Sequence, residues 1–467
     1  MPQTLGRSPI RSFADRPLGG MWRIVRGATT LKLPHLVQAA LAATPRLTAE
    51  RTLSDVHQPP AITYARIANG VIVRRERRWG AVAYVARRDR FFALDQHQAT
   101  LVRQLSNGDW TRTEEGDRPT IRLLAELGIC ATDPPTPQRT HFGHSAVGHF
   151  RASPEPTAPL VINCFATSHC PLQCRYCHAD DLMVPYREDE DERWLSDVIR
   201  TAAATPAIVG VVTGGEPLSR PDRTRRLIRE LARSKSVVLD TSGVGDFLAL
   251  LPTLREYNVH IRVSLDCADP NHNDSLRPIN RRYLALSTSA HEQACKTIRE
   301  AVYNGLSCSV QTVVTAVNSD LTQLVDLREL LISMGVTTWV LHVVVPAGKA
   351  SRPDRSNLLP DATVLRTLDE LVATTAADGC PLDIRVTSTH KAPNSVLLIN
   401  ARGELCVENS RGGGKITLRT AGPAPIARWL ILRAFRKYID MTGHSSRYLN
   451  GSLSSFPAPT EALLPGL

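Results

Sequence analysis

The sequence predicts an α/β protein built around a parallel sheet, with a small α+β region in front of it. Beyond residue 160, short apolar runs alternate with amphipathic stretches of helical period. This pattern is typical of strands that are buried on both faces and joined by helices. Six strand–helix units follow one another, which predicts parallel strands in either a partial barrel or an open doubly wound sheet. In both arrangements ligands bind at the carboxyl ends of the strands.

The apolar runs place the strands of this sheet at 160–167, 207–213, 236–242, 259–266, 307–315 and 337–345. The helices are expected at 190–203, 219–233, 246–256, 288–304, 322–334 and 362–376. This part of the chain is expected to end at residue 378. Residues 379–467 would then hold a hairpin that turns at 402–403 and a basic amphipathic helix at 426–441. Packing of that helix on the sheet, with a solvated cationic face, is favoured over contact with an anionic partner or membrane surface.

The region before the sheet divides into three parts. Residues 1–60 are rich in arginine and predict a poorly ordered basic extension. Residues 61–133 predict three strands, at 70–75, 80–86 and 90–94, followed by helices at 96–106 and 119–128. Residues 134–159 are rich in proline and lack apolar periodicity, which is typical of a linker.

Composition limits the class of protein. The chain has 467 residues and a formal net charge of +11, which suits an anionic partner as well as a solvated basic surface. Its 10 cysteines are too sparse for a small disulfide-stabilised scaffold. The sequence shows no signal peptide and no apolar run long enough for a membrane span, so a cytoplasmic protein is expected.

Three cysteines directly follow the first strand of the expected sheet. Cys170, Cys174 and Cys177 are separated by three and two residues, in the stretch CPLQCRYCH. Three thiolates in one short loop suit either three corners of an iron–sulfur cluster or three positions of a tetrahedral zinc site. The zinc interpretation needs a fourth ligand, for example His178. The spacing by itself does not choose between them.

Three further turns are expected at the same end of the sheet. TGGEP (213–217) follows the second strand, and its glycines leave backbone groups open to a ligand. Ser264 and Asp266, in VSLD at the end of the fourth strand, would share one face of that strand. VVPAGKA (344–350) follows the sixth strand. Four polar or glycine-containing turns at one end of one sheet indicate a functional site.

Together these motifs resemble the radical S-adenosylmethionine (SAM) superfamily. The resemblance covers about 161–350, continues more weakly to about residue 418, and rests on the cysteine loop, with Tyr176 before its last cysteine, and on the Gly-Gly-Glu-Pro turn. The segment after the fourth strand is similar to that of peptide-modifying members, and so is the fifth strand with its helix. The matching positions are Ser264, Leu265, Asp266, His272, Asp274, Arg277 and Asn318.

The resemblance implies a partial (β/α)6, TIM-like barrel that holds one [4Fe-4S] cluster and SAM. Cys170, Cys174 and Cys177 would bind three irons, which leaves the fourth iron open to SAM and gives His178 no role as a ligand. The resemblance further implies that Gly214, Gly215 and Glu216 hold the methionine amino end, that Ser264 and Asp266 hold the carboxylate or ribose, and that the stretch from Val344 to Gly348 holds the adenine. Reductive cleavage of SAM would give a 5′-deoxyadenosyl radical that takes hydrogen from a substrate.

The chain departs from many peptide-modifying relatives in its cysteines. It lacks their seven-cysteine C-terminal extension for auxiliary clusters, so one cluster is expected. A second cluster would have to draw on Cys267, Cys295, Cys308, Cys380 and Cys406. Cys267 stands where a glycine is usual, and its thiol could return a hydrogen atom to a substrate radical. A small semi-buried structural residue is the favoured interpretation of Cys267.

Residues 61–133 resemble the small winged-helix, PqqD-like domain that recognises leader peptides. In that family the leader adds as an extra strand to the third strand, here 90–94. The adjacent Arg87, Arg88 and Arg90 would suit an acidic leader. A winged helix can also bind nucleic acid.

The resemblance therefore implies an enzyme that modifies a ribosomally synthesised precursor peptide by crosslinking, epimerisation or backbone rearrangement. A flavodoxin or ferredoxin would supply its electrons. One alternative is a radical SAM enzyme that acts on RNA or on a small-molecule cofactor precursor. Another is a zinc-stabilised peptide-binding protein without catalytic activity.

Overall fold

The computed structural model describes residues 61–77, 79–105, 108–138, 156–183, 188–280, 289–361, 363–387, 397–408, 415–419 and 430–436. The expected basic extension and most of the expected linker lie outside these residues. Residues 430–436 are helical, inside the basic helix expected at 426–441, and the rest of that helix is not described.

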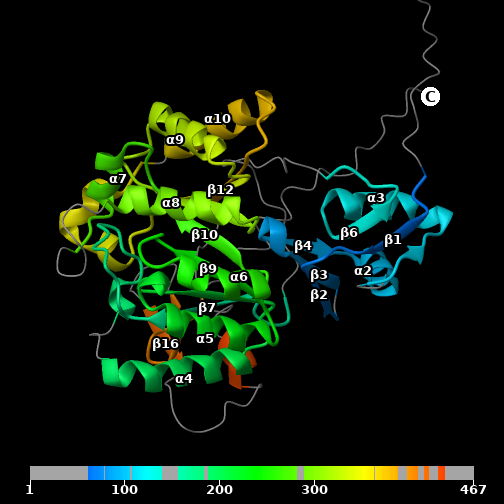
Figure 1. The fold of residues 1–467 in the computed structure, drawn as a ribbon, viewed down its shortest axis with the longest axis horizontal. Helices are drawn as coiled ribbons and strands as arrows, with labels where there is room; N and C mark the ends of the chain where they lie inside the picture. Colours follow the sequence, from blue (N-terminus) through cyan, green and yellow to red (C-terminus); the bar gives the residue numbers. More distant parts are fainter. Residues whose placement is uncertain are drawn as a thin grey trace, which may run out of the picture. The chain divides into compact units, whose positions relative to one another are not determined.

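A ten-stranded sheet forms the centre of the larger part of the molecule (Figure 1), in the order β13-β12-β11-β10-β9-β8-β7-β14-β15-β16. Its parallel strands are β7 (Val161–Thr167), β8 (Val209–Gly214), β9 (Ser236–Thr241), β10 (His260–Ser264), β11 (Cys308–Val314), β12 (Thr338–Val343) and β13 (Asp383–Thr387). β14 (Leu397–Ile399) runs parallel to β7, and β15 (Leu405–Glu408) and β16 (Lys415–Arg419) continue antiparallel. β7 to β13 lie side by side in the order of the sequence, without the reversal of a doubly wound sheet, and in the described part of the sheet the end strands β13 and β16 do not pair, so the sheet is a partial barrel.

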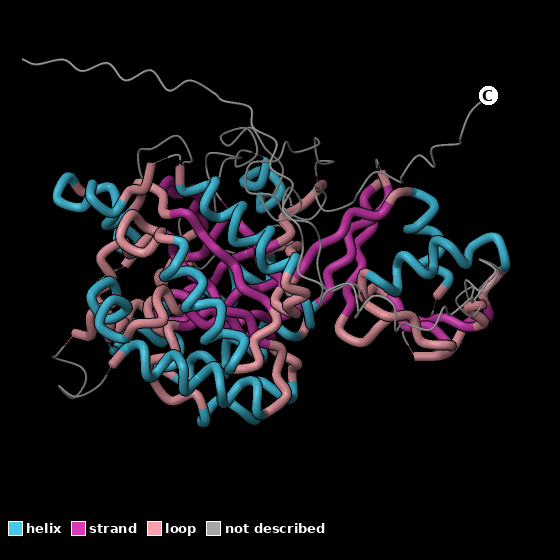
Figure 2. The backbone as a smooth tube through the Cα atoms, turned by 90° about the horizontal axis from the view of Figure 1, so that it is seen from above, coloured by secondary structure: helices cyan, strands magenta, loops and turns pink. Residues whose placement is uncertain are grey.

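Helices lie outside the strands, as Figures 1 and 2 show. They are α4 (Glu188–Ala204), α5 (Pro221–Ala232), α6 (Leu251–Glu256), α7 (Pro270–Leu276), α8 (Ala290–Tyr303), α9 (Leu321–Ser333) and α10 (Val364–Ala377). Their apolar faces and the outer faces of the strands form one large core. In α5, for example, Leu227, Ile228 and Leu231 are buried at helical spacing. The core fixes the strands, and the loops at their carboxyl ends are free to carry function.

The six predicted strands and the hairpin are confirmed, and the partial barrel is selected over the open sheet. β13, which pairs with β12 beyond the expected boundary at residue 378, is not among the predicted strands. The hairpin strand β14 pairs with β7, which its sequence did not indicate. That boundary therefore falls inside one continuous sheet.

The N-terminal module (residues 61–133) contains two small sheets, β5-β1-β6 and β2-β3-β4. Its elements are β1 (Tyr64–Ile67), β2 (Val71–Glu76), β3 (Gly80–Val85), β4 (Arg90–Leu94), α2 (Gln96–Gln104), β5 (Thr111–Arg112), α3 (Arg118–Glu126) and β6 (Cys130–Asp133). The three expected strands and both helices are confirmed. β1, β5 and β6 were missed, because strands this short carry little periodicity. The winged-helix assignment stays a prediction.

The sheet β2-β3-β4 is covered on both faces. One face packs with α2 and α3 in the core of the module. Val82, Tyr84 and Phe91 on the other face join a second cluster with residues at the start of the barrel, including Leu160 and Val209. All six residues of β3 are buried as a result. The module therefore closes the amino-terminal end of the parallel strands.

The contacts of β4 correct one expectation about leader binding. Arg90 is 3% exposed, and its Nη2 lies 2.9 Å from Oδ2 of Asp383 in β13. The guanidinium of Arg88 donates to Gln138. Arg87 is exposed, but Arg90 is inside the junction with the barrel and is not available to an acidic leader. The expectation that Arg90 faces a bound peptide is wrong, because its charge is needed by a carboxylate far along the chain.

Candidate active site

A cavity of about 470 Å³ lies at the carboxyl ends of the parallel strands. An adjoining cavity of about 330 Å³ shares Cys174, Cys177, Asp240 and Ser264 with it and extends to the end of β12. The sequence predicted a site at this end of the sheet. Among the predicted site residues, Cys170, Cys174, Cys177, Gly214, Gly215, Glu216 and Ser264 line the larger cavity, Val344 lines the adjoining one, and Asp266, Cys267 and Gly348 lie outside both.

Backbone hydrogen bonds hold the cysteine loop (168–179) in place. The amide of Gln173 donates to the carbonyl of Pro278 at 2.8 Å, and that of Arg175 donates to Leu276 at 2.9 Å. On its other side, the amide of Lys349 donates to the carbonyl of Cys177 at 2.9 Å. The loop is thus fixed by the turn after α7 and by the turn after β12.

The three thiols fit a metal cluster by donor type and by their place in one short loop at the cavity. Burial raises the pKa of Cys170, and it raises the pKa of Cys174 to about 11, so these thiols must lose protons when they bind a metal. Within the described part of the chain, no three His, Cys, Asp or Glu side chains stand close enough to form a preassembled metal site. The cysteine side chains therefore have to turn toward a common centre on binding, which a single short loop allows.

Three glycines let neighbouring turns approach the cysteine loop. A Cβ at Gly215 would lie 2.1 Å from the carbonyl oxygen of His169, and one at Gly348 would lie 2.2 Å from that of Cys177. Gly214, with φ of 131°, would place a Cβ 2.6 Å from the carbonyl oxygen of Thr167. These distances exclude any side chain. The glycines that the sequence analysis assigned to SAM therefore also support the backbone of the loop.

Glu216 joins the ends of β8 and β9. Its carboxylate is 1% exposed and accepts hydrogen bonds from the amide of Leu218 at 2.9 Å, from the amide of Ser242 at 2.7 Å, and from the hydroxyls of Thr241 and Ser242. Burial raises its pKa, and these hydrogen bonds oppose the shift. The carboxylate is occupied by groups of the protein, so its expected contact with the methionine amino group stays a prediction.

Asp266 and Tyr176 form a buried network behind the cavity. The hydroxyl of Tyr176 donates to the carboxylate of Asp266, which also accepts from the amide of Val313 at 2.9 Å. Nη1 of Arg277 lies 3.1 Å from the Tyr176 hydroxyl and 3.5 Å from Asp266. Asn318 donates to the backbone carbonyl of Asp266 at 3.0 Å. The structure thus places Asp266 as a support of the cysteine loop, and of the predicted pair it is Ser264 that lines the cavity.

Cys267 packs in a small apolar cluster with Tyr176, Leu276, Ala350 and Leu358. It is 4% exposed, and burial raises its pKa to about 12. This location agrees with the structural role favoured for it. Its proposed role as a hydrogen donor stays untested.

Several polar residues of the cavity wall are not among the predicted site residues. Asp240 lies in β9, Arg262 in β10 and Gln311 in β11, and all three line the larger cavity. His342 in β12 lies 3.2 Å from Oε1 of Gln311 through its Nε2. The available signal was a charged or amide residue inside a strand that is otherwise apolar, which in a barrel indicates an inward-facing position.

The match to a protein family decides between iron and zinc. Residues 165–331 match the family model of the radical SAM superfamily. Residues 165–331 of the chain therefore form a radical SAM domain. Its cofactors are those of the superfamily, a [4Fe-4S] cluster and SAM. The match covers the cysteine loop and selects the iron–sulfur interpretation over the zinc one.

Two curated relatives of this radical SAM protein carry different names. A pre-heme d1 synthase of Dinoroseobacter shibae is 26% identical over 259 residues, which cover 54% of this chain and 59% of the relative. A PqqA peptide cyclase of Streptomyces rochei is 27% identical over 312 residues, which cover 64% of this chain and 79% of the relative. The chain thus spans less than two thirds of the length of the first relative.

Solved structures of similar proteins include Streptococcus suis SuiB bound to S-adenosylmethionine, with a TM-score of 0.49, 13% identity and coverage of 73% of this chain and 82% of that one. Native anSMEcpe with bound AdoMet and Cp18Cys peptide has a TM-score of 0.47, 14% identity and coverage of 61% of this chain and 83% of that one.

No helix in the described part of the chain has the length and apolar character needed to cross a membrane.

Proposed function

We propose that the chain is an enzyme that modifies a ribosomally synthesised precursor peptide, after the N-terminal module has bound the peptide's leader. The observation that carries this proposal is a radical SAM barrel with a three-thiol cavity, joined in one chain to a module that has a cavity of its own between β2 and α2. The relative named PqqA peptide cyclase, which aligns over 64% of the chain, supports a peptide substrate. The modification would be a crosslink, an epimerisation or a backbone rearrangement.

When bound, the cluster and SAM supply a radical that takes hydrogen from the substrate. In this proposal, the residues of the chain hold and orient the reactants. Cys170, Cys174 and Cys177 hold the cluster, and Gly214 and Gly215 present backbone groups to the cavity. The network around Tyr176 keeps the cysteine loop in place while a substrate enters. A flavodoxin or ferredoxin would supply electrons in the cytoplasm, where thiols stay reduced.

Anaerobic reconstitution tests the catalytic half of the proposal. With iron, sulfide, a strong reductant and SAM, the full chain should produce 5′-deoxyadenosine and methionine. The variant with Cys170, Cys174 and Cys177 all changed to alanine should produce neither. Cys380→Ala is the control, because Cys380 is buried outside both cavities. Production of 5′-deoxyadenosine by the triple variant would sink the assignment.

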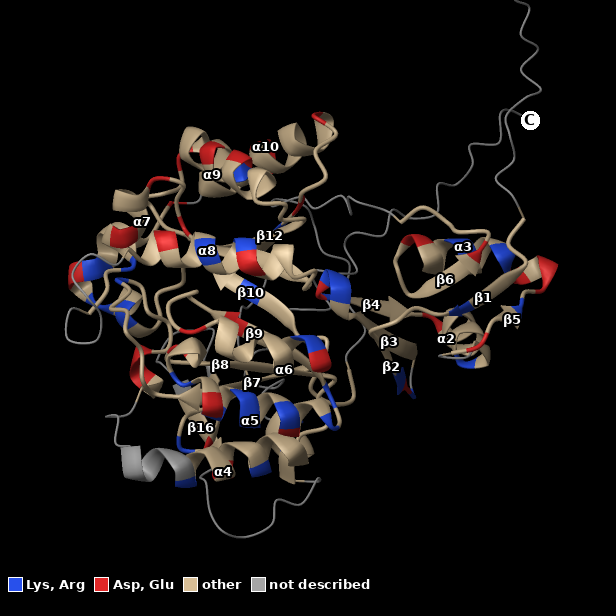
Figure 3. Cartoon of the chain, viewed as in Figure 1, with Lys and Arg blue, Asp and Glu red and all other residues tan. Residues whose placement is uncertain are grey.

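For the leader, we propose a groove between β2 and α2. This cavity of about 590 Å³ is lined by apolar residues of both elements, by Arg75, Arg77 and Arg103, and by one acidic residue, Glu76. All three arginines are exposed. β2 is a terminal strand of its sheet, and within the described residues it pairs only with β3. An added strand can therefore bond to its free edge and place alternate side chains in the groove. Figure 3 shows basic residues on β2 and α2, together with the acidic residue that ends β2.

Charge reversal tests this groove. The probes are synthetic leader peptides taken from short open reading frames beside the gene, together with an RNA oligonucleotide. Arg75→Glu with Arg103→Glu should weaken binding of an acidic leader by about tenfold at low salt. Arg112→Glu, which reverses an exposed charge on β5, should change binding by less than about twofold. Equal loss in both variants contradicts the groove, and tight binding of RNA instead of every peptide favours the nucleic-acid alternative.

A further inference from the structure

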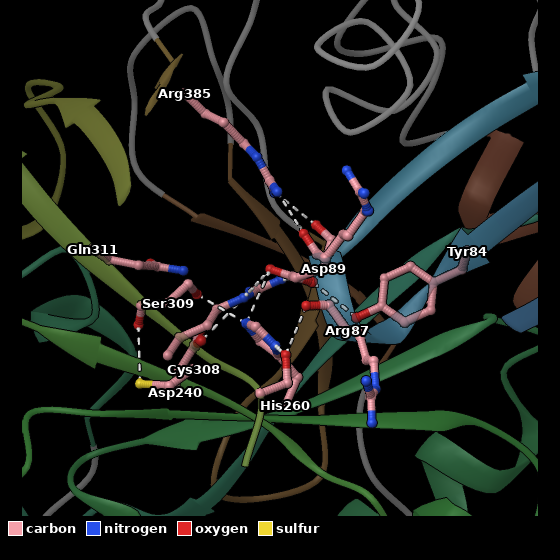
Figure 4. A network of polar contacts seen from close by, with 12 residues as sticks. Tyr84, Arg87, Asp89, Asp240, His260, Cys308, Ser309, Gln311 and Arg385 are labelled. Atoms are coloured by element: carbon pink, nitrogen blue, oxygen red, sulfur yellow. Dashed lines mark hydrogen bonds and ion pairs between the residues drawn. The ribbon is translucent and has the colours of Figure 1, made fainter. Parts of the chain in front are cut away.

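A chain of buried charged groups runs from the N-terminal module into the barrel (Figure 4). It starts at Asp89, which follows the short turn Ala86–Arg88 and adopts φ of 46° just before β4. Its two carboxylate oxygens bind the guanidinium of Arg262 in β10, at 2.7 Å to Nε and 2.9 Å to Nη2. Nη1 of the same guanidinium lies 3.4 Å from Oδ1 of Asp240 in β9. One arginine therefore connects two carboxylates that come from different parts of the molecule.

The surroundings of Asp89 fix the position of its carboxylate. The hydroxyl of Tyr84 donates to Oδ1 at 2.8 Å, and Nη1 of Arg385 donates to the backbone carbonyl of Asp89 at 2.8 Å. His260 lies 3.9 Å from Oδ2 through its Nε2. Tyr84, His260 and Arg262 are 0%, 2% and 6% exposed. Desolvation cancels much of the stability that such a buried ion pair could give, so the network is better explained by the geometry that it imposes.

The opposite end of this network faces the candidate active site. Arg262 and Asp240 both line the larger cavity, beside Ser264 and Gln311. The side chain of Asp240 is 26% exposed, whereas that of Asp89 is 5% exposed. The solvated end of the network is thus in the cavity, and the dry end is in the N-terminal module.

We propose that Asp89 is a positioning residue of the cavity. By fixing the guanidinium of Arg262, it orients the carboxylate of Asp240. Packing of the N-terminal module against the barrel therefore determines how these two polar side chains of the cavity wall face a substrate. The proposal rests on the proposed function in one respect, namely that this cavity is the reaction site.

A double-mutant cycle tests the connection without any cofactor. Asp89→Asn, Asp240→Asn and the double variant are compared by the unfolding equilibrium of the full chain. If Arg262 links the two carboxylates, the double variant departs by at least about threefold from the product of the two single effects. If the effect of the double variant on the unfolding equilibrium equals the product of the two single effects within about twofold, the proposal is overturned.

A second measurement separates positioning from simple stability. In the reconstituted enzyme, Asp89→Asn should raise the KM for SAM or peptide. The ratio between its change in KM and its change in kcat should be the same as in Asp240→Asn. Glu76→Gln is the matched control, because Glu76 is 1% exposed and pairs at 2.7 Å with Arg74, which binds barrel carbonyls at the same junction. Glu76→Gln should lower the unfolding midpoint but leave the KM for SAM within about twofold, and only the KM for SAM is compared because Glu76 also lines the proposed leader groove. Equal KM changes in Glu76→Gln overturn the proposal.

Tyr84→Phe covers the case in which Asp89→Asn does not fold. It removes one hydrogen bond from Asp89 and should shift KM in the same direction by a smaller factor, whereas a change in stability alone counts against positioning. If the wild-type chain forms no 5′-deoxyadenosine, the proposed function fails. The cycle on unfolding then still decides whether Asp89 and Asp240 are connected.

Discussion

At the scale of single residues, the cysteine loop depends on Tyr176, which the sequence marked only as part of a motif. Its hydroxyl connects the loop to Asp266 and Arg277, both buried. The charges of Arg277 and Asp266 in turn act in opposite directions on the pKa of Cys174. The hydroxyl of Tyr176 therefore connects the cysteine loop to a buried pair of charged residues.

Removing that phenol should loosen the loop. We expect Tyr176→Phe to cost about 1–3 kcal/mol of unfolding free energy, because it leaves two buried charged groups with one partner fewer. The iron content of the reconstituted protein should fall with it. Urea unfolding and iron analysis measure both effects. Tyr303→Phe is the control, since Tyr303 is 89% exposed. Equal results for the two variants would contradict this role.

The placement of Asp266 shows that a prediction from strand period fails beyond the end of the strand. The period of two puts Ser264 and Asp266 on one face only while the strand continues, and β10 ends at Ser264. Beyond that point the chain turns, and Asp266 bonds behind the cavity. Arg90 was misplaced for a different reason. Its partner Asp383 is 293 residues away in sequence, so no local pattern could reveal it.

At the scale of elements, the turns after β8 and β12 have two functions, because they line or approach the cavity and also support the cysteine loop. Gly348 shows this most clearly, with φ of 56° and a missing Cβ that would lie 2.2 Å from the carbonyl oxygen of Cys177. Gly379 has a similar φ of 63° but no heavy atom within 4 Å of its missing Cβ. The two glycines share the backbone requirement and differ only in the contact.

A pair of substitutions separates these two effects. Gly379→Ala should cost about 1 kcal/mol, the strain of a left-handed residue with a side chain. Gly348→Ala should cost more than that and should also lower iron retention, because its Cβ displaces the carbonyl of Cys177. Thermal unfolding and the iron content of the two variants test this. Equal iron content would show that the close approach at Gly348 has no influence on the cluster.

The barrel strands that could be predicted from the sequence differ in composition from the one that could not. The six barrel strands from β7 to β12 are mostly apolar runs, because helices and neighbouring strands bury both faces. β13 has the sequence DIRVT, whose Asp383 and Arg385 hide the apolar pattern. Both charged residues bond to the N-terminal module. Because β13 also contacts the N-terminal module, its sequence lacks the apolar pattern from which strands are predicted.

At the scale of the whole molecule, the junction between module and barrel contains a histidine that folding keeps neutral. His260 is 2% exposed, and its ring nitrogens bond to the hydroxyls of Ser307 at 2.7 Å and Ser309 at 2.8 Å. Burial, together with Arg262 and Arg385, lowers its pKa to about 4, and the nearby Asp89 opposes the shift. The ordinary pKa of histidine is about 6.5.

This shift predicts how stability depends on pH. Between about pH 6.5 and pH 4 the unfolded chain binds a proton at residue 260 that the folded chain does not bind, so the contribution of His260 is lost as pH falls through this window. At about 1.4 kcal/mol per pH unit, the loss from pH 7 to pH 5 is about 2 kcal/mol. Denaturant unfolding at the two pH values should show this decrease, and His260→Gln should reduce it by most of that amount. His97→Gln changes an exposed ring, 61% of whose side chain is accessible, and should keep the wild-type slope. If His260→Gln also keeps that slope, the junction does not hold this ring neutral, and the buried network at Asp89 would have to be open to water.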